Sequence, residues 1–143
     1  MDNRENIGLY RGKRVDNGEW VEGGICQAEK CACILVFNGF DTACDTTNCE
    51  LYEYKVIPET IGPCLVNHTD KNGKKIFVDD IHEFNGKKFV VKLGEYQDFD
   101  EEICGVGWYT EGEDGRQYSF NGYEDEYLNI IGNIHDNPEL LKS

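Results

Sequence analysis

The chain has 143 residues, 39% of them hydrophobic and 29% charged, a size that suits one domain or two small subdomains. Its 28 acidic and 14 basic residues give a net charge of −14, which opposes nonspecific binding to nucleic acid because such binding depends on neutralising phosphates. No apolar run approaches the ~20 residues that cross a bilayer, and the opening MDNRENIGLY lacks the apolar core of a signal peptide. We therefore expect a soluble protein of the bacterial cytoplasm.

Strand-forming segments follow one another along the chain, separated by Asn-Gly and Asp-Gly pairs. In chain order, the predicted strands cover residues 19–27, 32–37, 52–57, 74–84, 87–94, 103–112, 116–120 and 127–134. The turn pairs are Asn17-Gly18, Asn38-Gly39, Asn72-Gly73, Asn85-Gly86, Asp114-Gly115 and Asn121-Gly122. These residues accept the positive φ of tight hairpin turns, so the pattern predicts an antiparallel all-β protein.

The two ends of the predicted strand series give further expectations. Pro58, Gly62 and Pro63 interrupt the pattern and predict a boundary between an N-terminal β subdomain, residues 1–60, and a second subdomain, residues 61–143. One continuous domain is the alternative. Near the C-terminus, Asn137 can cap and Pro138 can begin a short helix.

Charge is distributed unevenly along the sequence. Residues 95–126 hold eleven acids and one base, Arg116, and so carry a charge of −10. Residues 70–94 hold six lysines and four acids, a charge of +2. The chain therefore contains one strongly acidic segment and one mildly basic island.

Four motifs, in order, resemble the YopX family, a group of small proteins of bacteriophages and prophages. They are YRGKRVDNGEWVEGG, VIPETIG, DKNGKKIFVDDI and LNIIGNIHDNPELL, and they extend along the whole chain. The resemblance implies an SH3-like small β-barrel with additional N-terminal antiparallel strands. It implies no established activity, although a nucleic-acid-binding role has been suggested for the family. Between residues 60 and 80 the sequence departs from the family pattern, so no function of that loop is carried over.

The acidic segment supplies the first candidate site. Its carboxylates alternate with aromatic residues, and such a surface can attract a basic protein and anchor it. The candidate residues are Glu101, Glu102, Trp108, Tyr109, Glu111 and Glu113. The alternative is a solvated sheet face over an aromatic core.

The basic island supplies the second candidate site. Lys74, Lys75, Lys87 and Lys88 flank two Asn-Gly turns and can form a nucleic-acid-binding face. The simpler alternative is a hairpin whose lysines keep the strand edges soluble.

Five of the seven cysteines lie within 24 residues and raise the question of a zinc site. They are Cys26, Cys31, Cys33, Cys44 and Cys49, spaced C-x4-C-x-C-x10-C-x4-C. This spacing matches no standard zinc template, and free buried thiols are the alternative.

We assign no cofactor and, because no catalytic motif is recognisable, predict a non-enzymatic accessory protein that binds a protein partner. Exposed strand edges could pair between two copies of the chain, so a homodimer is a further alternative.

Overall fold

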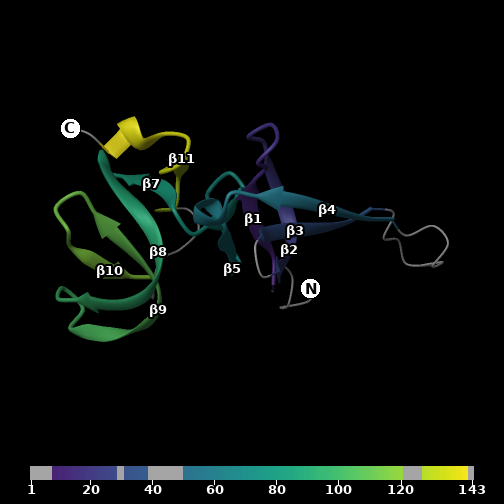
Figure 1. Cartoon of the computed structure of the whole chain (residues 1–143). Coiled ribbons are helices and arrows are strands. Elements are labelled where there is room, and N and C mark those ends of the chain that lie inside the picture. The colour runs from purple at the N-terminus through teal and green to yellow at the C-terminus, as the bar shows by residue number, and fades with distance from the viewer. Residues whose placement is uncertain (1–7, 29–30, 39–49, 121–126, 142–143) are drawn as a thin grey trace. The chain divides into compact units, whose positions relative to one another are not determined.

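The computed structural model describes residues 8–28, 31–38, 50–120 and 127–141 (Figure 1). In these residues the regular structure is almost entirely β-strand, arranged in two antiparallel sheets, so the predicted all-β class is confirmed. The chain divides into two compact units, one spanning Asn6–Cys64 and the other combining Met1–Glu5 with Leu65–Ser143. The assignment of residues 1–60 and 61–143 as subdomains stays a prediction.

The Asn6–Cys64 unit is a meander of antiparallel strands. These are β1 (Tyr10–Lys13), β2 (Trp20–Ala28), β3 (Cys31–Asn38), β4 (Glu50–Val56) and the first residues of β5 (Gly62–Thr69), in the order β4-β3-β2-β1-β5. Ala32, Ile34 and Val56 are buried and form the centre of its core. The predicted apolar run at residues 32–37 is therefore a central strand.

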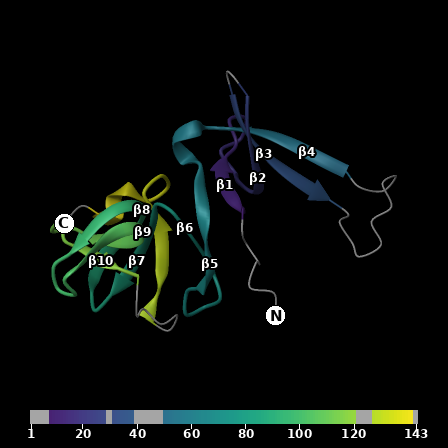
Figure 2. The same cartoon turned by 90° about the horizontal axis from the view of Figure 1, so that it is seen from below.

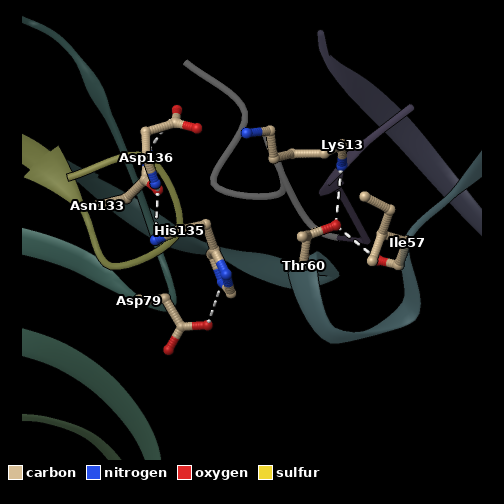
Figure 3. Close-up of polar contacts among 7 residues, drawn as sticks. All are labelled: Lys13, Ile57, Thr60, Asp79, Asn133, His135 and Asp136. Atoms are coloured by element: carbon tan, nitrogen blue, oxygen red, sulfur yellow. Dashed lines mark hydrogen bonds and ion pairs between the residues drawn. The ribbon is translucent and has the colours of Figure 1, made fainter. Parts of the chain in front are cut away.

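A 3₁₀ turn, η1 (Pro58–Thr60), connects β4 to β5 in this unit. The Thr60 hydroxyl donates to the Ile57 carbonyl at 2.6 Å and accepts from the Lys13 amide at 2.9 Å (Figure 3). These bonds tie the turn to β1. The sequence suggested only an interruption here, because Gly62 and Pro63 are weak strand formers, yet both pair with β1.

The Leu65–Ser143 part contains the remaining strands (Figure 2). They are β6 (Lys75–Phe77), β7 (Asp80–Phe84), β8 (Lys87–Asp98), β9 (Ile103–Gly112), β10 (Gln117–Ser119) and β11 (Ile130–Asn133). β6 pairs in the sheet that contains β5, and the other five form a sheet of order β10-β9-β8-β7-β11. The buried cluster is Leu65, Ile76, Val91, Phe120, Leu128 and Ile130.

Tight turns lie where the Asn-Gly and Asp-Gly pairs predict them. Gly18, Gly73, Gly86 and Gly115 all have positive φ. At the β7–β8 turn, Asn85 also has positive φ, which matches a type I′ hairpin turn. Asn38-Gly39 is described only as far as Asn38, and Asn121-Gly122 lies outside the described residues.

Buried aspartates fix several loops through their carboxylates. Asp70 accepts bonds from the amides of Asn72, Lys74 and Ile130 at 2.9 to 3.1 Å. Asp80 accepts from the Phe77 amide at 2.8 Å. Part of the negative charge of the chain therefore satisfies backbone donors inside the fold.

In the long β8–β9 hairpin, β8 is curved (Figure 1), and two glycines lie directly opposite each other in the two strands. Gly94 and Gly107 have φ values of 151° and 158°, a conformation that favours glycine. The end of β8 lies beside β10, where Asp98 Oδ2 accepts from the Ser119 amide at 2.8 Å and Gln117 Oε1 accepts from the Gln97 amide at 2.9 Å. Each of these two bonds joins a side chain of one strand to a backbone amide of the other.

The finer details of the predicted fold are not confirmed. Among the described residues, β10 and β11 are the edges of their sheet and no closed barrel forms. The predicted strand at residues 74–84 is two strands, separated by a turn in which Asp79 has a φ of 75°. The C-terminal segment Pro138–Leu141 is a single 3₁₀ turn, η3, so an α-helix is not confirmed there.

Candidate functional site

The predicted acidic residues lie at opposite ends of the β8–β9 hairpin. Asp98 pairs with Ile103 at one end, which we call the far end, and Phe89 pairs with Gly112 at the other, the near end. Glu101 and Glu102 lie in the turn at the far end, whereas Glu111 and Glu113 lie at the near end. Nine residue steps of β9, on the order of 30 Å of strand, separate them. The single acidic face expected from the sequence is therefore divided.

The two predicted aromatic anchors face inward. Tyr109 is only 8% exposed and stacks on Tyr96 with ring centroids 5.4 Å apart. Trp108 packs against the buried cluster around Val91. Both rings therefore stabilise the hairpin in this structure.

Other apolar side chains are exposed at the far end. Phe99 is 78% exposed and Val106 is 79% exposed, and Leu93 is about half exposed. Leu93 and Val106 share a face of the hairpin, since Leu93 pairs with Trp108 and Val106 pairs with Glu95 two positions further along. Leu93 and Val106 are not among the predicted site residues, although they lie on the same face of the hairpin as the buried Val91.

Exposed carboxylates lie next to two of these apolar side chains, Val106 and Phe99. Glu95 is exposed directly opposite Val106, and Asp100, Glu101 and Glu102 are exposed in the turn beside Phe99. Asp98 Oδ1 accepts from the amides of Asp100 and Glu101 at 3.1 Å, which fixes the turn. We call Leu93, Glu95, Phe99, Glu101, Glu102 and Val106 the far-end surface.

The near end brings members of both predicted sites to one cavity. Lys87 and Lys88, predicted to bind nucleic acid, line a cavity of about 340 Å³ together with Glu113, Asp114 and two aromatic rings, those of Phe89 and Tyr118. The rings meet edge to face, with centroids 5.7 Å apart. We call this space the near-end cavity.

The other two predicted lysines belong to a different sheet. Lys74 precedes β6 and Lys75 begins it, and both are exposed. β6 lies in the sheet that contains β5, whereas Lys87 and Lys88 begin β8. The four lysines are therefore divided between two sheets and do not lie on one pair of neighbouring strands, as the predicted basic hairpin requires.

A second cavity, of about 410 Å³, shares Gly112 and Glu113 with the first and is lined also by Ile134 and Leu141. In its wall Lys92 Nζ donates to Glu111 Oε2 at 2.8 Å. This hydrogen bond lowers the pKa of Glu111 and raises the pKa of Lys92. The charge of the predicted site residue Glu111 is thus balanced by the ammonium group of Lys92 within the hairpin.

A histidine–aspartate pair connects the C-terminal segment to the turn before β7 (Figure 3). His135 Nε2 lies 3.0 Å from Asp79 Oδ2, and Asn133 Oδ1 accepts from the amides of His135 and Asp136. The Ile134 amide also donates to the Asp79 carbonyl. These contacts hold the segment NIHDN, residues 133–137, against the start of β7, so the pair has a positioning role.

Two cysteines of the zinc hypothesis face each other across a strand pair. Cys26 in β2 lies directly opposite Cys33 in β3, and the Cys33 thiol donates to Glu53 Oε1 at 3.2 Å. Cys44, Cys49 and the side chain of Cys31 lie outside the described part of the chain. Within the part of the chain that the structure describes, no three His, Cys, Asp or Glu side chains form a metal-binding group. Zinc binding stays the untested alternative to free thiols.

Comparison with known proteins identifies the family. In the described part of the chain, no helix has both the length and the apolar character needed to cross a membrane. No curated protein and no solved structure matches the sequence. A family model described as YopX protein matches residues 9–142, nearly the whole chain. The chain therefore belongs to the YopX family.

Proposed function

We propose that this protein is a non-catalytic binding protein that attaches to a basic surface of another protein through the far-end surface. The observation that carries the proposal is the exposure of Phe99 and Val106, 78% and 79%, beside Glu95, Glu101 and Glu102. Exposed apolar side chains accompanied by charged neighbours, as at this end of the hairpin, are typical of interaction sites. The proposal keeps the acidic, aromatic character predicted from the sequence. It retains Glu101 and Glu102 and replaces the other predicted residues with Leu93, Glu95, Phe99 and Val106.

The chemistry of the far-end surface defines the complementary partner. Exposed carboxylates attract a positively charged protein over a distance of about one Debye length and speed its association. The Phe99 ring can then enter an apolar pocket, as aromatic anchors do at interfaces. The partner surface is therefore expected to combine lysine or arginine residues with an apolar depression.

Nucleic-acid binding through the lysines is the less favoured alternative. Lys87 and Lys88 share the near-end cavity with Glu113 and Asp114, so the lining has no net positive charge. The net charge of −14 adds long-range repulsion of phosphate. A nucleic-acid binder is expected to lose affinity with salt at a slope of roughly −0.7 to −0.9 per phosphate contact, so retention on DNA or RNA at low salt tests this alternative directly.

Family membership suggests a phage-type protein, and we extend the proposal accordingly. The protein is proposed to act in the cytoplasm of a bacterial host, on a host protein. The curled β8–β9–β10 arrangement, connected by Asp98 and Gln117, supports an SH3-like relationship. An exposed strand edge offers a route to a homodimer.

Affinity capture from host lysate tests the proposal. The bait is the wild-type protein or one of two variants, Phe99→Ser with Val106→Ser, or Glu101→Gln with Glu102→Gln. We expect the apolar double variant to reduce recovery of specific partners at least about 10-fold, because truncated anchors cost about 2 kcal/mol or more. The charge variant should reduce recovery less, and mainly at low salt.

Two matched controls separate the site from general changes in charge and polarity. Val15→Ser removes a similarly exposed apolar side chain of the other unit, and Glu19→Gln with Glu59→Gln removes the same two charges there. Both controls should capture partners as the wild type does. Equal capture by wild type and by the Phe99 and Val106 variant would overturn the proposed function.

A further inference from the structure

We propose that the near-end cavity binds a small zwitterion with a flat apolar side chain, such as a free aromatic amino acid or a short peptide with charged termini. The cavity lies at the opposite end of the hairpin from the far-end surface, so this inference is independent of the proposed function. Its volume, about 340 Å³, is at the lower end of the usual range for ligand sites and suits a small molecule.

The charged groups of the lining require a ligand with both signs of charge. Lys87 and Lys88 supply two ammonium groups, and Glu113 and Asp114 supply two carboxylates. A purely anionic or purely cationic ligand would meet like charges on one wall. A zwitterion can place its carboxylate toward the lysines and its ammonium group toward the acids.

The aromatic rings define the third part of the ligand. Phe89 and Tyr118 meet edge to face and both line the cavity. Such a ring pair provides an apolar surface against which a flat side chain can pack. It also adds a favourable interaction for a nearby ammonium group.

Gly112 keeps the space between these groups open. A Cβ atom added there would lie 2.9 Å from Asp114 Oδ1 and 3.4 Å from the Phe89 ring. Gly112 lies in strand β9 and has no positive φ, so its backbone accommodates alanine. A methyl group at this position would therefore enter the cavity without requiring a new backbone conformation, and it would push aside the Asp114 carboxylate, whose Oδ1 accepts from the Arg116 amide at 3.0 Å.

A matched set of probes tests the inference by titration followed with NMR chemical shifts. L-tryptophan carries both charges, indole-3-propionate only the carboxylate, tryptamine only the ammonium group and N-acetyl-L-tryptophanamide neither. A Trp-Gly dipeptide distinguishes a free amino acid from a peptide, and AMP represents an anionic aromatic ligand. We expect the zwitterions to bind most tightly, with shifts at residues 86–89 and 112–118.

Variants assign the two charged walls. Glu113→Gln with Asp114→Asn should weaken L-tryptophan binding about fivefold and leave indole-3-propionate unchanged. Lys87→Ala with Lys88→Ala should weaken both ligands, and Gly112→Ala should weaken all of them by occupying space. The control Glu19→Gln with Glu59→Gln, which removes two exposed charges of the other unit, should change none. Equal affinity for L-tryptophan and N-acetyl-L-tryptophanamide, tighter binding of AMP, or no binding of any probe would overturn the inference.

Discussion

The near and far ends of the β8–β9 hairpin use the same two strands but are stabilised in different ways. At the near end, Val91 and Thr110 are fully buried opposite each other, and Val91 belongs to the apolar core. At the far end, polar bonds from Gln97 and Asp98 connect β8 to β10. One end is therefore stabilised mainly by the burial of apolar surface, and the other mainly by hydrogen bonds.

This difference explains why apolar residues can remain exposed at the far end. The tyrosine stack and the Asp98 bonds lie on one face of the bent hairpin, whereas Leu93 and Val106 lie on the opposite face. Folding of the far end does not require those two side chains to be buried. The side chains of Leu93 and Val106 are consequently free to contact a partner protein, which agrees with the function that we propose.

The largest expected effect follows from removing the carboxylate that stabilises the far end. Asp98→Ala leaves three backbone amides without their acceptor, those of Asp100, Glu101 and Ser119. We expect it to lower the free energy of unfolding by roughly 3 kcal/mol, mostly through the buried Ser119 amide. Urea denaturation at neutral pH measures the change.

Asp100→Ala is the matched control for this prediction. Asp100 is exposed and lies 3.9 Å from the exposed Arg116, so its removal should cost about 0.5 kcal/mol or less. If Asp98→Ala were as mild as this control, the far end would not depend on hydrogen bonds, and the contrast between the two ends would fail.

A pair of valine substitutions compares the two ends directly. Val91→Ala leaves a cavity in the core and should lower the free energy of unfolding by about 2 kcal/mol. Val106→Ala removes the same atoms from an exposed position and should change it by about 0.5 kcal/mol or less. Chemical denaturation of both variants in one buffer gives the comparison. Similar losses at the two positions would show that Val106 is buried in solution, and the far-end surface would have to be abandoned.

Local turn chemistry made much of the fold predictable from the sequence. At Gly18, Gly73, Gly86 and Gly115 the backbone requirement for positive φ is encoded in two adjacent residues. Strand β9, at Ile103–Gly112, was predicted with its observed bounds. These features depend on short segments, and the sequence therefore carries enough information to specify them.

Features that depend on distant contacts were less predictable. Val91 and Leu93 lie on the same face of β8, yet core residues cover only Val91. Gly94 and Gly107 are weak strand formers, and their direct pairing is visible only in the register. Likewise, Lys88 and Glu113 are far apart in sequence, and only the pairing of β8 with β9 brings them to one cavity.

The smallest expected effect concerns pH and the near end. His82 in β7 is fully buried and pairs with Phe89, with ring centroids 5.7 Å apart. Its Nδ1 accepts from the Asn129 amide at 3.1 Å. Burial lowers the pKa of His82 below its usual value of about 6.5, so the neutral form is favoured in the folded protein.

The sign of the pH dependence follows from this shift. Below about pH 6.5 the unfolded chain binds a proton at residue 82 that the folded protein does not, so the free energy of unfolding falls as pH decreases toward the lowered pKa of the folded state. The slope from this one site is at most about 1.4 kcal/mol per pH unit. In His82→Asn the amide oxygen replaces Nδ1 as acceptor and the titration disappears. We therefore expect the free energy of unfolding of the variant, measured by urea denaturation, to depend less steeply on pH than that of the wild type between pH 7 and pH 5. The carboxylates are the same in both proteins, so their contributions cancel in the comparison. Parallel slopes would mean that His82 is solvated, and that the near end is less completely buried than the contrast with the far end requires.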